Sequence, residues 1–413
     1  MRISPLLLAL AVTACARPAT RPSQLTDAEL LERARALHER VITIDTHDDI
    51  PLNFATPEVD PLNYERQVNL NKMKAGGLDV AFFAVFVGQS PRTPENTERA
   101  KTDAMTKFTA IHRLTEQMHP GLIELAYTPA DVKRIHDSGK LVAAIGIENG
   151  YVIGNDLALV KKYFDLGARY MTLAHTRNND ICDSSTDSIP EHNGLSAFGR
   201  QVVAEMNRVG MMVDISHVSK NCMMQATALS KAPVVASHSS TRAYADVPRN
   251  LDDEQLLAIK KNGGVAQMVA LAGYVKVDPP AKRAAIDTLR RSLGITGGGR
   301  GAMAALTESQ RGEYQRRSAE IEAKWPGPNV ADFVNHIEHA VKVAGIDHVG
   351  ISSDFDGGGG ITGWRDASQT MNVTAELIKR GYSEEQIRKL WGGNLLRVWG
   401  ENARIAAEHK TKA

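Results

Sequence analysis

The chain has 413 residues, of which 43% are hydrophobic, and its 49 basic and 48 acidic side chains leave a formal net charge of +1. This balance argues against a surface built to bind nucleic acid, and the length suits one large barrel as well as two smaller domains. Beyond the N-terminus no run of 20 apolar residues occurs, so we expect no segment of the mature chain to cross a membrane.

The first 15 residues have the pattern of an export signal. A short basic region precedes an apolar run over residues 3–12, and two small residues then precede Cys15. This resembles a bacterial lipoprotein signal that is cleaved before a lipid-carrying cysteine, whereas a plain signal peptide with an incidental cysteine is the alternative. Residues 16–25 are expected to be a flexible tether. We therefore expect an exported protein on the periplasmic side, anchored to the outer membrane only by lipid on Cys15.

After the tether, a helix is predicted over residues 26–40, which opens on a Thr-x-x-Glu capping box. A strand rich in β-branched residues follows over residues 41–49 and ends in His47 and Asp49. Because alternate side chains of a strand share a face, these two should point the same way, with Ile44 on the opposite face. Such a pair is suited to binding a metal ion, although alone it more often belongs to a polar turn.

The same arrangement, an apolar run that ends in an ionisable residue, recurs downstream. The later runs end at Glu148, His175, His217, His238 and Asp354. Near-continuous apolar runs are typical of parallel strands covered on both faces, and segments with helical character separate them. The sequence therefore predicts a (β/α)8 barrel of the TIM type, over residues 26–405, in which the C-terminal ends of the strands meet at one mouth.

Other elements complete this pattern without supplying a ligand. Two further strands are expected, at residues 79–87 and 263–271. Helices are predicted over residues 97–118, 131–138, 156–166, 196–209, 220–230 and 330–344, and a final helix around residues 392–399 should cap the barrel. We expect His112 and His119 to lie at the surface. Cys182 and Cys222 remain after processing, and the sequence leaves open whether they pair.

Residues 279–328 interrupt the strand and helix alternation before the last strand. The segment is polar and charged, and it should hold helices over residues 284–292 and 308–324. A solvated excursion, a lid and an oligomer contact all fit this composition. The oligomeric state stays open, a homodimer included.

The residues gathered at the mouth have the chemistry of a metal site. They are His47, Asp49, Glu148, His175, His217, His238 and Asp354. Imidazole and carboxylate without thiolate suit zinc or a similar divalent ion. One tetrahedral zinc cannot use so many groups, whereas two ions with a carboxylate between them can.

Several motifs around these residues resemble the renal or membrane dipeptidase family, within the metal-dependent amidohydrolase superfamily. They are Thr46-His47-Asp48-Asp49-Ile50-Pro51, Ile145-Gly146-Ile147-Glu148-Asn149-Gly150, Asp214-Ile215-Ser216-His217, Ser237-His238-Ser239-Ser240, Arg249-Asn250-Leu251-Asp252-Asp253 and Gly350-Ile351-Ser352-Ser353-Asp354-Phe355-Asp356-Gly357. They occur in order between residues 41 and 399. The chain is therefore identified as a member of this family, of bacterial lipoprotein type.

The resemblance implies a function for each position. His47 and Asp49 would bind one zinc ion and His217 and His238 a second, with Glu148 as the bridge between them. His175 would contact the substrate at the scissile carbonyl, Arg249 would bind the substrate carboxylate, and Asp354 would contact the substrate as the acid and base. The implied reaction is hydrolysis of dipeptides by a hydroxide held between two zinc ions.

Other functions stay open at this stage. A related binuclear hydrolase acting on N-acyl amino acids, lactones or phosphoesters would keep the same metal ligands. A non-catalytic zinc-binding lipoprotein would more readily have lost one ligand or Asp354. Asp48, where the family often has Asn, and the 279–328 segment depart from the family pattern and bear on the range of substrates. No nucleophile motif surrounds Ser237.

Overall fold

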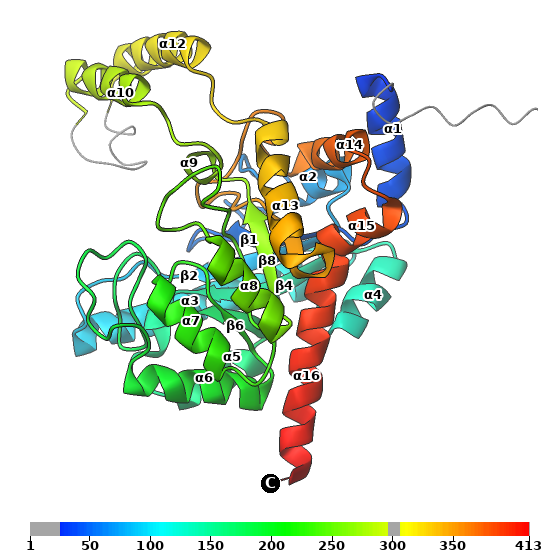
Figure 1. The fold of residues 1–413 in the computed structure, drawn as a ribbon, viewed down its shortest axis with the longest axis vertical. Helices are drawn as coiled ribbons and strands as arrows, with labels where there is room; N and C mark the ends of the chain where they lie inside the picture. Colours follow the sequence, from blue (N-terminus) through cyan, green and yellow to red (C-terminus); the bar gives the residue numbers. More distant parts are fainter. Residues whose placement is uncertain (1–24, 296–305, 413) are drawn as a thin grey trace, which may run out of the picture.

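The computed structural model describes residues 25–295 and 306–412, so the export signal and Cys15 lie outside the described part. At its centre is a parallel sheet whose strands follow one another in the order β1-β2-β4-β5-β6-β7-β8-β9, which confirms the predicted barrel (Figure 1). The strands are β1 (Ile44–Asp49), β2 (Val80–Phe86), β4 (Leu141–Glu148), β5 (Ala168–Thr172), β6 (Met212–Asp214), β7 (Val235–Ala236), β8 (Val265–Val269) and β9 (Val349–Ser352). An additional short strand, β3 (Ile123–Leu125), pairs with the start of β4 and was not predicted.

The barrel closes between β1 and β9. The backbone N–H of Asp49 donates to the carbonyl of Phe355 at 2.9 Å. Lower in the same seam, the N–H of Ser353 donates to the carboxylate of Asp45, also at 2.9 Å. A fully buried side chain therefore supplies the acceptor that a neighbouring backbone would supply in a regular ladder.

A bulge in β1 sets the direction of the first site residues. Ile44 pairs with Val80 and Asp49 pairs with Ala84, so β1 takes five residue steps where β2 takes four. An extra residue of this kind reverses the inward and outward alternation of the side chains that follow it.

The bulge overturns one expectation from the sequence. Ile44 belongs to the apolar cluster inside the barrel, together with Phe82 and Tyr170. His47 forms a hydrogen bond to the hydroxyl of the same Tyr170, at 2.9 Å. The prediction that Ile44 and His47 lie on opposite faces is therefore wrong, because regular alternation does not hold across the bulge.

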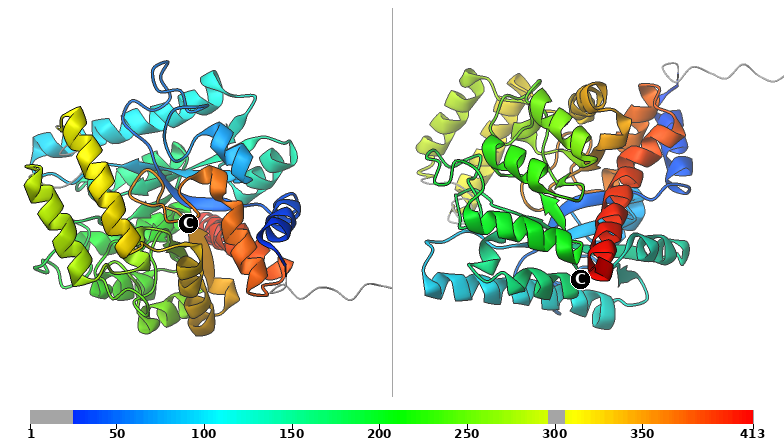
Figure 2. Two further views of the ribbon diagram at one scale, coloured as in Figure 1. Left: turned by 90° about the horizontal axis from the view of Figure 1, so that it is seen from above. Right: turned by 60° about the horizontal axis from the view of Figure 1, so that its bottom comes forward.

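Helices surround the barrel, and the predicted ones are present with shifted ends (Figure 2). Helix α3 begins three residues before its predicted start, since Thr93 caps it and Pro94 occupies its first turn. The bounds of the helices are α1 (Asp27–His38), α2 (Leu70–Gly76), α3 (Pro94–Arg113), α4 (Pro129–Asp137), α5 (Ala158–Asp165), α6 (Ala197–Val209), α7 (Lys220–Leu229), α8 (Asp253–Asn262), α9 (Ala272–Val275), α10 (Pro280–Ser292), α12 (Glu308–Lys324), α13 (Val330–Ala344), α14 (Met371–Lys379), α15 (Glu384–Arg388) and α16 (Asn394–Lys412).

Helix α16 closes the end of the barrel where the strands begin. Its residues Leu395, Val398 and Trp399 are buried in one cluster with the first inward residues of the strands, such as Val80 and Val265. The left view of Figure 2 looks along the barrel, with α16 end-on behind its centre. The prediction that the closing segment caps the barrel is confirmed.

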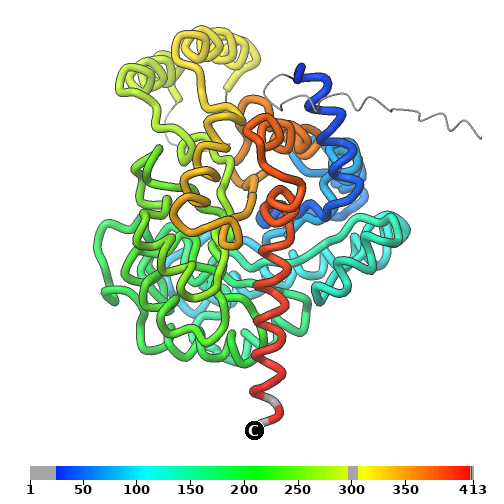
Figure 3. Tube along the Cα trace, turned by 45° about the vertical axis from the view of Figure 1, so that its right-hand side comes forward, coloured from blue at the N-terminus to red at the C-terminus, as the bar shows by residue number. Residues whose placement is uncertain are grey.

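The 279–328 segment forms the helices α10 and α12, which lie side by side at one edge of the molecule (Figure 3). They are joined through a small apolar cluster that includes Leu289, Leu293 and Tyr314 and is separate from the main cores. Within residues 25–295 and 306–412, no helix has both the length and the apolar character needed to cross a bilayer.

Candidate metal centre and substrate pocket

The site residues predicted from the sequence lie together at the C-terminal ends of the strands. His47 and Asp49 come from β1, Glu148 ends β4, and His175, His217, His238 and Asp354 follow β5, β6, β7 and β9. Asp49, Glu148, His175, His217 and Asp354 line a cavity of about 610 Å³ that is also lined by Arg249 and Tyr274, and His47 and His238 contact Glu148 at its wall. The barrel thus gathers into one pocket residues that are up to 307 positions apart along the chain.

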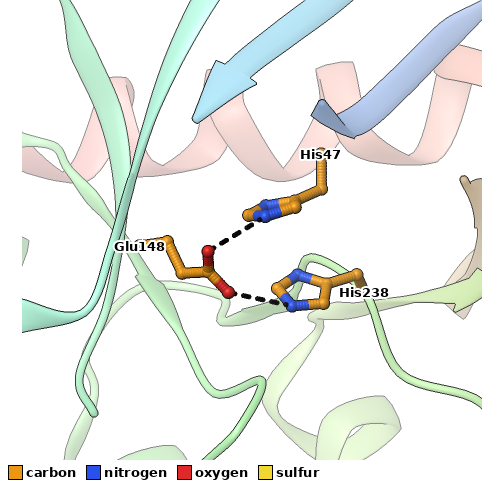
Figure 4. A group of neighbouring side chains, drawn as sticks. All are labelled: His47, Glu148 and His238. Atoms are coloured by element: carbon orange, nitrogen blue, oxygen red, sulfur yellow. Dashed lines mark ion pairs between the residues drawn. The ribbon is translucent and has the colours of Figure 1, made fainter. Parts of the chain in front are cut away.

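Glu148 lies at the centre of this group, and its two carboxylate oxygens face different partners. Oε2 is 3.4 Å from Nε2 of His47, whereas Oε1 is 3.0 Å from Nε2 of His217 and 3.4 Å from Nε2 of His238. Figure 4 shows His47 and His238 pointing at opposite oxygens of the carboxylate. A carboxylate placed this way is suited to bridging two cations.

Two side chains extend the group on either side of Glu148. Asp49 lies 3.8 Å from Nε2 of His47, and the ligand atoms of His47, Asp49 and Asp354 all lie within 4.8 Å of one another. On the other side, Nε2 of His175 is 3.4 Å from Oε1 of Glu148. The described residues therefore hold more than one set of metal-type ligands.

A hydrogen-bond chain fixes the tautomer of His47. The hydroxyl of Tyr170 donates to the backbone carbonyl of Thr46 at 2.9 Å, so it accepts from Nδ1–H of His47. The lone pair of His47 is therefore on Nε2, which is buried and has no hydrogen-bond partner within the described residues. A buried nitrogen acceptor aimed at carboxylates fits a metal ligand.

A second chain orients His238 in the same way. The hydroxyl of Ser237 donates to the carboxylate of Asp214 at 2.7 Å, and so it accepts from Nδ1–H of His238 at 2.8 Å. Nε2 of His238 then also carries a lone pair directed at Glu148. Ser237, which lacked the motif of a nucleophile, positions an imidazole instead.

The electrostatics of the pocket favour bound cations. Burial would raise the pKa of Glu148, but the imidazoles around it, His47 first, hold the pKa well below its usual range. Burial lowers the pKa of His238 well below 6.5, which favours the neutral, ligating form. Burial also opposes protonation of His47, yet the carboxylates of Glu148, Asp49 and Asp354 together outweigh it and raise the pKa to about 10, so Nε2 favours a cation, either a proton or a metal ion in its place. The donor set fits zinc or a similar divalent ion.

Asp354 is held in a tight turn against the metal-type ligands. Its backbone has a φ of 60°, and burial raises the pKa of its carboxyl well above the usual value. A Cβ atom on Gly357 would lie 2.3 Å from Oδ1 of Asp354 and 2.2 Å from Oδ2 of Asp49. Only glycine therefore allows the backbone to pass this close to the two carboxylates.

Arg249 lies on the pocket wall and makes no ion pair with the acidic residues beside it in sequence. Its guanidinium donates to the hydroxyl of Ser239 and to the carbonyl of His238, at 3.2 and 2.9 Å, and stacks over Tyr274. Asp252 pairs with Lys220 and Asp253 with His339 instead. A structural brace between Arg249 and these acids is thus absent from the described part of the chain.

Several residues that shape the pocket were missed from the sequence. Tyr170 and Ser237 act through partners on other strands, which no local motif reveals. Phe86, at the end of β2, packs against His175 with ring centroids 4.7 Å apart. Lys107 was also missed, although the sequence held a signal for its burial, because it lies next to Phe108 on the apolar face of α3. His112 and His119 pair with Glu116 and Asp60, away from the pocket, and Cys182 and Cys222 are buried free thiols.

Comparison with known proteins gives consistent matches over this fold. A family model described as membrane dipeptidase (peptidase family M19) matches residues 31–413. Dipeptidase tcpJ of Claviceps purpurea (strain 20.1) is 33% identical over 350 residues, which cover 83% of this chain and 71% of that protein. An uncharacterized dipeptidase, C965.12, of Schizosaccharomyces pombe is 30% identical over 403 residues, covering 92% and 85%. Among solved structures, the probable dipeptidase PvdM from Pseudomonas aeruginosa has a TM-score of 0.79 and 35% identity, with 92% of this chain and 99% of that chain covered.

Proposed function

Because the chain belongs to the membrane dipeptidase family, peptidase family M19, we propose that it is a metal-dependent hydrolase that cleaves the peptide bond of dipeptides with a free C-terminal carboxylate. One observation carries the proposal: Glu148 presents its two oxygens to separate groups of ligands in the same pocket that Arg249 lines. The site thus combines metal-type ligands with a cation suited to a carboxylate.

We infer that the site takes two zinc ions per chain. The first would be held by His47, Asp49 and Oε2 of Glu148, and the second by His217, His238 and Oε1 of Glu148; the distances within each group support this division. Divalent ions in such a pair polarise a carbonyl and lower the pKa of water to near neutrality.

The remaining residues have separate tasks. Arg249 holds the substrate carboxylate, because a planar guanidinium matches it in a bidentate manner. His175, on the pocket wall beside Glu148, donates a hydrogen bond to the oxygen on which negative charge develops. Asp354 accepts the proton of the attacking water and passes it to the departing amine.

The experiment that tests the substrate anchor compares a dipeptide with its C-terminal amide. Wild type should strongly prefer the free acid, and Arg249→Ala should lose that preference mainly through a lower kcat/KM for the acid. Arg242→Ala is the matched control, since Arg242 belongs to the same loop but pairs with Asp246 outside the pocket. If Arg249→Ala discriminates as wild type does, Arg249 is not the anchor.

The bridging position of Glu148 is tested by metal content. Glu148→Gln should lose metal, because a neutral amide cannot bridge two dications as a carboxylate does. Elemental analysis of the purified variant measures this independently of activity. Retention of two metal ions at wild-type affinity would exclude the bridge.

We also propose that the protein is exported and anchored to the outer membrane by lipid on Cys15. The support is the sequence alone, since a short apolar run and two small residues precede this cysteine. A lipidated chain should partition with membranes, because several acyl chains anchor stably. A Cys15→Ser protein should be released to the soluble fraction, and its persistence in the membrane fraction would refute the anchor.

A further inference from the structure

A second cation, Lys107, lies in the pocket wall without a bonded partner. Its side chain is on the buried face of α3, and the residue is 5% exposed. The amine lies over the ring of Phe86, 5.7 Å from its centroid, and makes no hydrogen bond or ion pair with any residue that the structure describes. Burial of an ammonium group without a partner is costly, so its presence at a substrate pocket calls for an anionic ligand.

The environment of Lys107 favours its charged form in part. Burial lowers the pKa of the amine, whereas the carboxylates of Asp49, Glu148 and Asp103 act in the opposite direction. None of these three comes within ion-pair distance of the amine. Asp49, Glu148 and Asp103 therefore favour the charged amine from a distance, without contact.

Lys107 and Arg249 lie on opposite sides of the barrel mouth. Phe86, beneath Lys107, is the last residue of β2, and Arg249 follows β7. Three strands separate β2 from β7 in each direction around the barrel. Both cations line the same cavity as Glu148, His175 and His217. A dipeptide held by its carboxylate at Arg249, with its amide at the metal ligands, therefore directs its N-terminal residue toward Lys107.

A smaller cavity adjoins the main one at this point. It has a volume of about 190 Å³ and shares Phe86 and Lys107 with the main pocket. Its wall also carries Arg99 and Asp103, and Arg99 donates to the hydroxyl of Ser90 at 3.1 Å. Two cations and one acid leave the cavity with a positive balance. The space, equal to that of roughly six water molecules, admits a side chain.

Building on the proposed dipeptidase function, we propose that Lys107 determines specificity by binding the side-chain carboxylate of the substrate's N-terminal residue, so that dipeptides beginning with Glu or Asp are preferred. The α-ammonium of the same residue is repelled by Lys107, which turns the side chain rather than the amine toward the smaller cavity. A basic side chain at this position meets two cations and is disfavoured.

The test measures kcat/KM for Glu-Ala, for its neutral isostere Gln-Ala and for Lys-Ala. Wild type should prefer Glu-Ala over Gln-Ala by about tenfold or more, the range of a hydrogen bond between charged groups. Lys107→Met should abolish this ratio, and Lys107→Arg should retain part of it because the charge remains. Lys101→Met is the matched control on the same helix, since the Lys101 amine pairs with Glu98 instead.

Metal content, measured by elemental analysis, separates a change in specificity from a loss of the metal centre. The inference is overturned if wild type shows no preference for Glu-Ala, or if Lys107→Met keeps the wild-type ratio. If wild type cleaves Gln-Ala as efficiently as Glu-Ala, only the role of Lys107 is overturned, and the proposed dipeptidase function stands. Wild type with full metal content that cleaves no dipeptide contradicts the proposed function itself.

Discussion

At the scale of single residues, the site depends on side chains that do not line the pocket themselves. Tyr170 and Ser237 each accept a hydrogen bond from an imidazole Nδ1–H and donate to a fixed oxygen, which places the lone pair of each imidazole on Nε2, the atom that faces Glu148. The sequence predicted which side chains gather at the strand ends, because each follows an apolar run. Their orientation was not predictable, because it depends on partners from other strands.

Tyr170→Phe tests this orientation. The ring and its stacking on Phe82 remain, but Nδ1 of His47 loses its acceptor, so we expect metal affinity to fall by about 10- to 100-fold. Competition with a chelator measures the affinity. Tyr163→Phe is the control, because that buried hydroxyl donates to Val152 far from the site. Equal metal affinity in wild type and Tyr170→Phe would show that the hydrogen bond does not matter.

Gly357→Ala should damage the site without unfolding the barrel. The new methyl group would overlap the carboxylates of Asp49 and Asp354, which must then move from their present places. We expect weaker metal binding and lower kcat, with the circular dichroism spectrum unchanged. Gly312→Ala, where the same methyl group meets nothing within 4 Å, should leave both unchanged. Wild-type kcat in Gly357→Ala would mean that the turn relaxes easily.

At the scale of elements, buried polar groups fix how the outer helices attach to the barrel. His38, at the end of α1, donates from Nδ1 to the carbonyl of Gly77 at 3.0 Å and accepts at Nε2 from Thr374 of α14 at 2.7 Å. Thr374 in turn accepts from the indole of Trp391 at 2.8 Å. One imidazole therefore joins three segments, and it can do so only while it is neutral.

The buried, neutral imidazole of His38 predicts that the fold loses stability at acidic pH. Burial lowers the pKa of His38 from 6.5 to about 4, with the hydrogen bond to Gly77 opposing the shift. Because the folded pKa is the lower one, the contribution of His38 to stability is complete above pH 6.5 and is lost as the pH falls toward 4. The loss amounts to about 3 kcal/mol. His38→Gln should show a smaller fall in melting temperature between pH 7 and pH 4.5 than wild type, and parallel curves would contradict the assignment.

The elements also show where sequence patterns stop being informative. Capping residues indicated where helices begin, and Thr26 and Glu29 form the expected capping box at α1. The bulge in β1, between Asp45 and Asp48, was not predicted, because no glycine marks it. The short strand β3 was missed since three residues are too few to show a period.

At the scale of the whole molecule, the barrel was predictable because its strands are short and apolar, alternate with helices, and in most cases end near an ionisable residue. The contacts that close it were not predictable, since the seam between β1 and β9 uses the side chain of Asp45 and residues more than 300 positions apart. The packing of α10 on α12 likewise depends on the cluster around Leu289, which the polar composition of the segment concealed.

The sealing of the barrel by α16 predicts a large effect far from the metal site. Trp399→Ala removes the largest side chain of the helix from the interior cluster and should cost about 3–5 kcal/mol of stability. Scanning calorimetry measures the change. Arg404→Ala on the same helix, whose exposed side chain pairs only with Glu401 and Glu408, should cost at most about 1 kcal/mol. Similar losses in the two variants would refute the sealing role.

The position of α16 at the end of the chain also determines when, during synthesis, the barrel can close. Trp399 is made about 350 residues after Ile44, the strand residue that it shares a cluster with. At about 5–20 residues per second, the ribosome needs roughly 20–70 seconds to cover that distance. Throughout this interval the first strands have been synthesised, but Trp399, which shields their interior from water, has not. A chain truncated before residue 394 therefore lacks α16, and one end of its barrel stays open to water. We expect proteases to degrade such a chain, rather than that it folds into a weakened enzyme.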